Sequence, residues 1–265
     1  MATVVLLRQA MGNGSLHTAR VRFGIAFMVV SLGLLVAAWA AWAHGVGASL
    51  GGALAIALTI WTALACWVVS VAWLLPVDRG SEYRRVHWLY GKRNDGTRVW
   101  WALLLTLPVL APMWLWWHLR RATLTEAPWH ELLPDLVIGR RLLDREFDLE
   151  VDHIVDLTCE YAERPQQRCH PGYVSLPIVD GAAPPTQVLL QYAVRLSKLQ
   201  GRIFLHCAEG HGRTATVAAA LLIVRGIASD VDDALARIAA VRPKAHPYER
   251  QLRVLRRITE HGADT

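Results

Sequence analysis

Two uncharged, apolar stretches dominate the N-terminal half of the chain. The first runs from Phe23 to Val77, 55 residues without Asp, Glu, Lys or Arg. This is about twice the length that one helix needs to cross a ~30 Å hydrocarbon core. The segment 44–49, which contains Gly45 and Gly47, interrupts the stretch and favours a turn. The pattern therefore predicts two membrane helices, at about residues 23–43 and 50–75.

The second stretch, Val99 to Leu119, also carries no formal charge and predicts a third membrane helix over 99–119. Pro108 and Pro112 would bend this helix, which membrane helices tolerate. Tryptophans lie near both ends of the stretch, as in the aromatic belts at membrane interfaces. Residues 1–125 are thus expected to form an all-helical membrane region in contact with the lipid bilayer.

The pattern changes near residue 126, where apolar runs shorten and charges become regular. Short strands are expected at 154–157, 173–176 and 202–206, and helices at 186–199, 214–224 and 249–260. Ser229, followed by three aspartates, is expected to cap a further helix. Alternating strands and helices predict an α/β domain over 126–265, with a mainly parallel central sheet flanked by helices.

Charge separates the two halves in the same way. Residues 1–125 hold 11 Lys or Arg and three Asp or Glu, whereas residues 126–265 hold 17 and 19. The basic residues of the first half flank apolar runs, so they indicate a membrane surface and no nucleic-acid partner. The four cysteines, Cys66, Cys159, Cys169 and Cys207, have no CxxC spacing, so no metal is expected.

Candidate chemistry concentrates where the predicted strand 202–206 ends. Cys207 follows the strand, five residues separate it from Arg213, and a helix is expected to begin directly afterwards. Loop amides and a helix N-terminus together attract an anion, and an arginine fork can bind two phosphate oxygens. The same donors stabilise a thiolate, which makes Cys207 a candidate nucleophile. The expected phosphate-binding residues are Ala208, Glu209, Gly210, His211, Gly212 and Arg213.

The segment from His206 to Thr214 resembles the HCxxGxxR[ST] signature of the cysteine-dependent protein tyrosine and dual-specificity phosphatase superfamily. The resemblance extends over about residues 130–260, including an opening strand at 131–139 and a closing Arg242-Pro243 pair. It implies a dual-specificity-phosphatase-like fold with no cofactor. It also implies that Thr214 helps the thiolate leave, and that His206 orients the loop and tunes the thiol.

The same resemblance implies a general acid on a loop upstream of the nucleophile. Asp180, in the sequence Asp-Gly-Ala-Ala-Pro, is the candidate, and the alternative is a plain Asp-Gly turn. Asp156 is expected to be a structural residue at a strand end. Cys159 lies where related lipid phosphatases place a cysteine that pairs with the nucleophile, and the alternative is a packing residue.

The function expected from these features is a membrane-anchored phosphatase that forms a cysteinyl-phosphate intermediate. Its substrate would be a phosphorylated protein or a phospholipid headgroup. Glu209 disfavours a polyanionic inositol lipid, because His211 beside it is mostly neutral near pH 7. Two alternatives stay open: a catalytically inactive membrane adaptor that binds phosphorylated partners, and sulfur transfer on a rhodanese-like loop.

Two indications disagree about the membrane face of the catalytic domain. Arginines before residue 23 and in the loop 76–98 place both segments in the cytoplasm, so three crossings would put the catalytic domain outside. Thiolate enzymes, in contrast, usually work in reducing compartments. The Ala-, Arg- and Leu-rich composition suggests a bacterial cytoplasmic membrane. The sequence leaves the face of the catalytic domain open.

Overall fold

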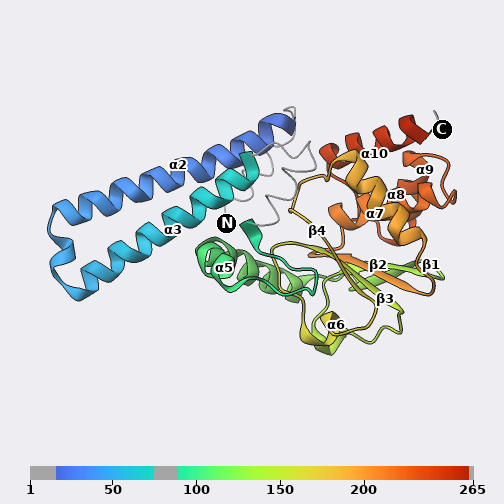
Figure 1. Cartoon of the computed structure of the whole chain (residues 1–265), viewed down its shortest axis with the longest axis horizontal. Coiled ribbons are helices and arrows are strands. Elements are labelled where there is room, and N and C mark those ends of the chain that lie inside the picture. The colour runs from blue at the N-terminus through green and yellow to red at the C-terminus, as the bar shows by residue number, and fades with distance from the viewer. Residues whose placement is uncertain (1–15, 75–88, 263–265) are drawn as a thin grey trace. The chain divides into compact units, whose positions relative to one another are not determined.

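The computed structural model describes residues 16–74 and 89–262, and the chain divides into two units (Figure 1). One unit comprises Met1–Pro76 and Trp101–Thr123. The other comprises Val77–Trp100 and Leu124–Thr265. The expected boundary at residue 125 therefore differs in one respect, because the segment before the third apolar helix groups with the C-terminal domain.

The first unit consists of long apolar helices. Helices α2 (Leu16–Ala43) and α3 (Leu50–Leu74) form an antiparallel hairpin joined by the short 3-10 turn η2 (Val46–Ala48). Ser31 and Ser70 donate hydrogen bonds to carbonyls across the hairpin, at 2.8 and 2.7 Å. Such side-chain bonds and small residues are typical of helices that pack in lipid.

Helix α5 (Trp100–Thr123) contains Pro108 and Pro112 without interruption of the helix. Pro108 has no N–H, so the carbonyl of Leu104 one turn earlier loses its helical partner. The indole Nε1–H of Trp61 donates to this carbonyl at 3.0 Å. Among the described residues, α2, α3 and α5 each contain a segment long and apolar enough to cross a membrane. The first two cover the predicted spans 23–43 and 50–75 closely, and α5 extends four residues beyond the predicted 119.

The C-terminal unit is built on a five-stranded sheet in the order β1-β2-β5-β3-β4. The strands are β1 (Trp129–Leu133), β2 (Leu136–Arg140), β3 (His153–Thr158), β4 (Tyr173–Ile178) and β5 (Ile203–Cys207). Only β1 pairs antiparallel, and the other neighbours are parallel. The predicted α/β class is therefore confirmed. The expected single opening strand is a β1–β2 hairpin, which turns at Pro134 and Asp135.

Helices cover both faces of the sheet unequally. Helices α7 (Thr186–Ser197), α8 (Gly212–Val224), α9 (Val231–Val241) and α10 (Glu249–Gly262) gather on one face, and the one-turn α6 (Pro165–Arg168) lies on the other (Figure 1). The larger core joins these four helices to the sheet, and a smaller core around Val137, Ile154 and Phe204 fills the opposite face under the loop containing the 3-10 turn η3 (Asp144–Glu146). The cap of α9 is Asp230, whose side chain accepts from the Asp233 N–H, and not Ser229.

Candidate active site

The candidate nucleophile lies at the end of the central strand. β5 runs between β2 and β3, ends at Cys207, and is followed by the loop that leads into α8 at Gly212. Cys207 is buried, and its Sγ accepts a hydrogen bond from the Gly210 N–H at 3.3 Å. Gly210 has a φ of 72°, and a Cβ there would lie 2.4 Å from the Gly139 backbone. The loop therefore requires glycine at this position in order to turn its amide toward the sulfur.

Arg242 holds this loop from behind. Its buried guanidinium donates to the carbonyls of Gly210 at 3.0 Å and Glu209 at 3.1 Å. It also donates to the Ala127 carbonyl at 2.9 Å. Arg242 thereby fixes the carbonyls of Glu209 and Gly210, while the Gly210 N–H contacts the Cys207 sulfur. From the sequence, Arg242 was identified only as part of an Arg-Pro pair. Its contact with the phosphate loop could not be predicted, because the two segments lie more than 30 residues apart.

Arg213, at the start of α8, is oriented by a carboxylate that the sequence analysis did not identify. Its two terminal nitrogens form a bidentate pair with Glu160 at 2.9 and 2.7 Å, and Nη1 also donates to the Ile178 carbonyl at 2.9 Å. Both side chains are buried. Burial alone would raise the pKa of Glu160, but Arg213 outweighs it and keeps that pKa low. The pair therefore fixes the guanidinium plane beside the loop.

Asp180 lies next to the same guanidinium. It follows β4, in a turn closed by the Ala182 N–H to the Val179 carbonyl at 3.0 Å, with Gly181 at a φ of 66°. The Asp-Gly turn is present, and it brings Asp180 Oδ1 within 3.1 Å of Arg213 Nη2, while the role of Asp180 as general acid stays a prediction. The side chain keeps 62% of its surface exposed, so it can meet an incoming group.

Several groups influence the ionisation of Asp180. Loss of hydration within the surrounding loops raises its pKa, the carboxylates of Glu160 and Glu209 raise it further, and Arg213 opposes the rise. Most of the side chain remains exposed, so solvent screens these charges. A carboxyl group with a raised pKa is suited to donate a proton near neutral pH.

A buried amide supports the loop that carries Asp180. Gln251, in α10, donates from Nε2 to the Ala182 carbonyl at 2.8 Å, and its Oε1 accepts from the Tyr248 N–H at 2.8 Å. Gln251 is fully buried. The last helix therefore holds the Asp180 loop through the Nε2 of Gln251, whose Oε1 is fixed by the backbone just before α10.

At the rim of the phosphate loop, His211 lies between two carboxylates. His211 Nε2 lies 2.7 Å from Glu126 Oε2, and His211 Nδ1 lies 3.6 Å from Glu209 Oε2. Glu126 also pairs with Arg242 at 3.2 Å. Glu209 is partly exposed, and it adds negative charge beside the loop.

Two expected supporting residues are buried with unused polar atoms. Thr214 Oγ1 has no hydrogen-bond partner in the part of the chain that the structure describes. The same is true of both ring nitrogens of His206, whose ring stacks on Phe204 and lies 3.6 Å from Glu163 Oε2. Burial lowers the pKa of His206 to about 4, so the ring is neutral at pH 7. Thr214 is thus free to donate to a group at the loop.

Cys159, the expected redox partner, is buried after β3 and is a free thiol, as is Cys207. Its Sγ–H donates to Glu160 Oε2 at 3.5 Å. Burial, and then the neighbouring Glu160 carboxylate, raise the pKa of this thiol well above its usual value. Cys159 is therefore held protonated against the partner of Arg213, and a disulfide role for it stays a prediction.

Asp156, Glu163 and His206 form a buried cluster whose ligand atoms lie within 4.8 Å of one another. The donor set does not suit a metal ion. Asp156 already accepts four hydrogen bonds, from Lys92, Tyr173, and the N–H and hydroxyl of Thr158. Lys92 brings a positive charge within 2.6 Å of the same carboxylate. The cluster is an internal ion-pair network behind the phosphate loop, which agrees with the structural role expected for Asp156.

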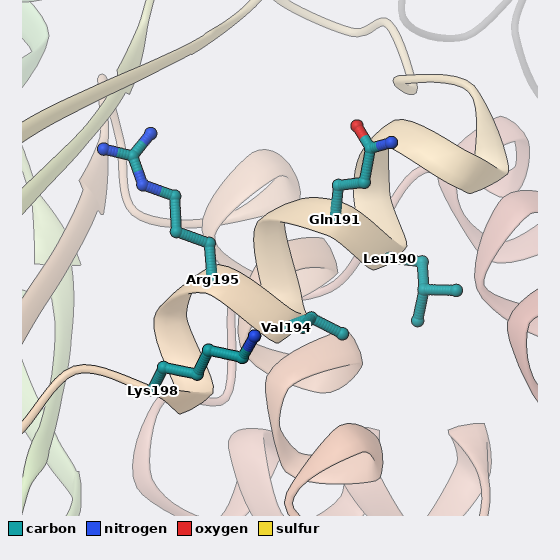
Figure 2. A pocket seen from close by; sticks show the side chains of 5 residues that line it. All are labelled: Leu190, Gln191, Val194, Arg195 and Lys198. Carbon is teal, nitrogen blue, oxygen red and sulfur yellow. The ribbon is translucent and has the colours of Figure 1, made fainter.

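A separate surface hollow lies along α7 (Figure 2), lined by Leu190, Gln191, Val194, Arg195 and Lys198. All five residues come from one helix and its end, and their side chains fan out without converging on one point. None belongs to the phosphate loop. We assign no role to this hollow.

Comparisons with known proteins agree with this geometry. Residues 140–264 match the family model described as the Swiss Army Knife protein DSP-PTPase phosphatase domain, PTP-SAK. Comparison with curated proteins gives no match.

Similar solved structures include Tk-PTP in the active form, with 25% identity and a TM-score of 0.44 over 50% of this chain and 97% of that chain. PTPMT1 in complex with PI(5)P shares 18% identity, with a TM-score of 0.45 over 52% and 98%. Human DUSP28 shares 20%, with a TM-score of 0.41 over 52% and 97%. Over residues 140–264, the C-terminal part of this chain is thus similar to phosphatase domains of the dual-specificity superfamily.

Proposed function

We propose that the chain is a membrane-anchored phosphatase that hydrolyses phosphomonoesters through a cysteinyl-phosphate intermediate. The observation that supports this most directly is the Cys207 sulfur accepting a loop amide beside Arg213, whose guanidinium is fixed by Glu160. The Gly210 amide is an N–H donor to this sulfur, and backbone donors of this kind can also hold phosphate oxygens.

In the first step, Cys207 Sγ attacks phosphorus, and the sulfur–phosphorus bond forms as the phosphorus–oxygen bond of the ester breaks. The leaving oxygen takes the proton of Asp180, and Arg213 with the loop amides holds the remaining phosphate oxygens. In the second step, water attacks phosphorus and gives a proton to Asp180, and the sulfur leaves as thiolate. The unpartnered Thr214 hydroxyl can donate to that thiolate.

Protonation of Asp180 would make the charge balance of the site more favourable for an anion. Arg213 faces two carboxylates, Glu160 and Asp180, and Glu209 adds a third nearby. A phosphate dianion would meet less repulsion once Asp180 is neutral. The same negative rim favours a monoester with one phosphate, on a protein or a lipid headgroup, over a polyphosphorylated inositol lipid.

Membrane anchoring is part of the proposal and is supported by α2 and α3. Each contains an apolar segment of at least 20 residues, and each exposes large apolar side chains such as Val36, Trp39 and Leu54. Exposed apolar surface of this extent is costly in water and favourable in lipid.

The test is phosphate release by the full chain in detergent with a chelator present. Substrates are a phosphotyrosine peptide and a short-chain phosphatidylglycerol phosphate. We expect turnover by the wild type, none by Cys207→Ser, and a roughly 10²- to 10⁴-fold lower rate for Asp180→Asn. Cys169→Ser, which removes an exposed thiol, is the matched control and should keep full activity.

Two outcomes would contradict the proposal. Activity retained by Cys207→Ser would exclude the cysteinyl intermediate. Phosphate binding without turnover of either substrate by the wild type would favour the membrane adaptor instead.

A further inference from the structure

The segment before α5 is folded into the catalytic unit. Lys92 Nζ pairs with Asp156 Oδ2 at 2.6 Å and donates to the Tyr161 carbonyl at 2.6 Å. The side chains of Lys92 and Asp156 are both fully buried. A buried pair of this kind is costly to separate, because each charge would be left without its partner. Lys92 is therefore an internal residue of the phosphatase domain, although it precedes α5.

Backbone contacts extend this docking along the segment. The Glu163 N–H donates to the Gly96 carbonyl at 2.8 Å, and Arg98 Nη1 donates to the Glu160 carbonyl at 3.3 Å. A Cβ on Gly96 would lie 2.6 Å from the Tyr173 hydroxyl, so backbone and domain are in close contact. Arg98 lies two residues before α5 begins at Trp100. The N-terminal end of α5 thus emerges from the catalytic unit.

The segment after α5 is held by the same unit. Glu126 lies three residues beyond the end of α5 at Thr123, and its carboxylate contacts His211 at 2.7 Å and Arg242 at 3.2 Å. Both partners belong to the machinery around the phosphate loop. The C-terminal end of α5 is therefore tied to the domain by a link of about 10 Å at most.

These two attachments restrict how α5 can lie in a membrane. Its 24 residues give a length of about 36 Å, enough to cross a ~30 Å hydrocarbon core. A crossing would place Arg98 and Glu126 on opposite faces of the bilayer. Both residues contact one folded domain, which occupies one face.

We propose that α5 enters and leaves the bilayer at the same face, so that the chain crosses the membrane only twice, through α2 and α3. This rests on the membrane anchoring proposed above, and not on the phosphatase chemistry. The lipid bilayer is the partner of α5. Its exposed residues include Trp100, Leu104, Leu115 and Leu119, whereas Ala102, Thr106, Leu110 and Trp117 are buried. The exposed face is mostly apolar along the helix, and α5 runs unbroken through Pro108 and Pro112, so with both ends at one face it would lie along the bilayer surface.

The proposal removes the disagreement about membrane orientation. With two crossings, the N-terminus, the arginine-rich loop 76–98 and the catalytic domain all lie on one face. Positive charges mark that face as cytoplasmic, and a reactive thiolate is suited to the reducing cytoplasm. The phosphatase site would then lie on the cytoplasmic side of the membrane.

The test is cysteine labelling of the full chain in sealed membranes with a membrane-impermeant maleimide. The parent protein for labelling carries Cys207→Ser and Cys169→Ser. Its two remaining cysteines, Cys66 and Cys159, are buried, and their labelling gives the background signal. Three reporters are compared: Asn94→Cys in the segment before α5, restored Cys169 in the catalytic domain, and Gly47→Cys at the tip of the α2–α3 hairpin. Asn94 and Cys169 are both exposed, and a Cβ on Gly47 has no close clash.

We expect Asn94→Cys and Cys169 to be labelled from the same face, and Gly47→Cys from the opposite face. Labelling of Asn94→Cys and Cys169 from opposite faces would overturn the proposal, because α5 would then cross. Phosphate release by the parent chain is measured separately, so a failure of this topology and a failure of the enzymatic proposal are distinguishable.

Discussion

At the scale of single residues, the arginine that would bind phosphate depends on a carboxylate from another strand end. Glu160 orients Arg213 through two short bonds in a buried setting. We predict that Glu160→Gln lowers the free energy of unfolding by about 3 kcal/mol, because it leaves a buried cation with a weakened partner. It should also lower kcat/KM by at least about tenfold, through loss of guanidinium orientation.

The control for this variant is Glu131→Gln, which removes an ion pair with Arg202 of similar length at an exposed position. Exposed pairs contribute about 1 kcal/mol or less. Urea unfolding and phosphate release would be measured for both variants. Equal effects of the two would show that the Glu160–Arg213 pair has no special role.

The pH dependence of activity reports on Asp180. Its pKa is raised by loss of hydration and by Glu160 and Glu209, and only the protonated form can donate to the leaving oxygen. We predict that kcat/KM falls as pH rises through this pKa, and that Asp180→Asn removes that descending limb. A descending limb that persists unchanged in Asp180→Asn would assign the acid to another residue.

The pKa values of the buried Glu163 and His206 are shifted in opposite directions, so we predict that their effects on the pH dependence of stability cancel. Burial, and then Asp156, raise the pKa of Glu163 to about 7, while burial lowers the pKa of His206 to about 4. Between about pH 4.5 and 6.5, the folded pair holds one proton on Glu163, and the unfolded pair holds one on His206. The pair therefore adds no slope to the free energy of unfolding as a function of pH in this range.

Glu163→Gln should reveal the contribution of His206 alone to the pH dependence of stability. The unfolded state then binds one proton more than the folded state between about pH 4 and 6.5, so the free energy of unfolding rises with pH. The rise would be up to about 1.4 kcal/mol per pH unit relative to the wild type. Urea unfolding at pH 5 and pH 6.5 checks this, and parallel behaviour of variant and wild type would contradict it.

At the scale of elements, the segment before α5 should behave as part of the domain core. Lys92→Met removes the partner of a fully buried Asp156, and we predict a loss of about 3–5 kcal/mol in the free energy of unfolding of the catalytic domain. Arg93→Met, at the exposed next position, is the control and should change it by less than about 0.5 kcal/mol. A thermal unfolding comparison in detergent is sufficient, and equal midpoints for the two variants would contradict the docking.

Elements defined by local pattern were predictable from the sequence. The three long apolar helices, the strand that ends at Cys207 and the helix that follows were all expected, because apolar periodicity and the strand–loop–helix motif are local signals. The α9 cap moved by one residue, since both Ser229 and Asp230 can cap and only the chain geometry selects Asp230. The opening strand became a hairpin because Pro134 cannot donate to a ladder.

The contacts that support the site were not predictable in this way. Glu160, Arg242 and Gln251 act through partners that lie 53, 32 and 69 residues away. Each is a common residue type without a local signature. The one sequence feature that could have pointed to Glu160 is its position as an acidic residue two positions after Thr158, where a buried strand ends.

At the scale of the whole molecule, two regions of different composition share one chain. Residues 1–125 carry the apolar helices and the excess positive charge, and residues 126–265 carry a near-neutral phosphatase domain. The sequence divided them at residue 125, but the segment Val77–Trp100 groups with the domain. Hydropathy could not anticipate this, since Lys92 is read as a loop charge until its partner Asp156 is known.

The most direct test of the central claim is to trap the covalent intermediate. The full chain would be mixed with a ³²P-labelled phosphotyrosine peptide, quenched in acid within the first turnover, digested and mapped. We predict a phosphate adduct on the peptide that carries Cys207, absent in Cys207→Ser. Turnover of the same substrate without any labelled cysteine would contradict a cysteinyl-phosphate mechanism.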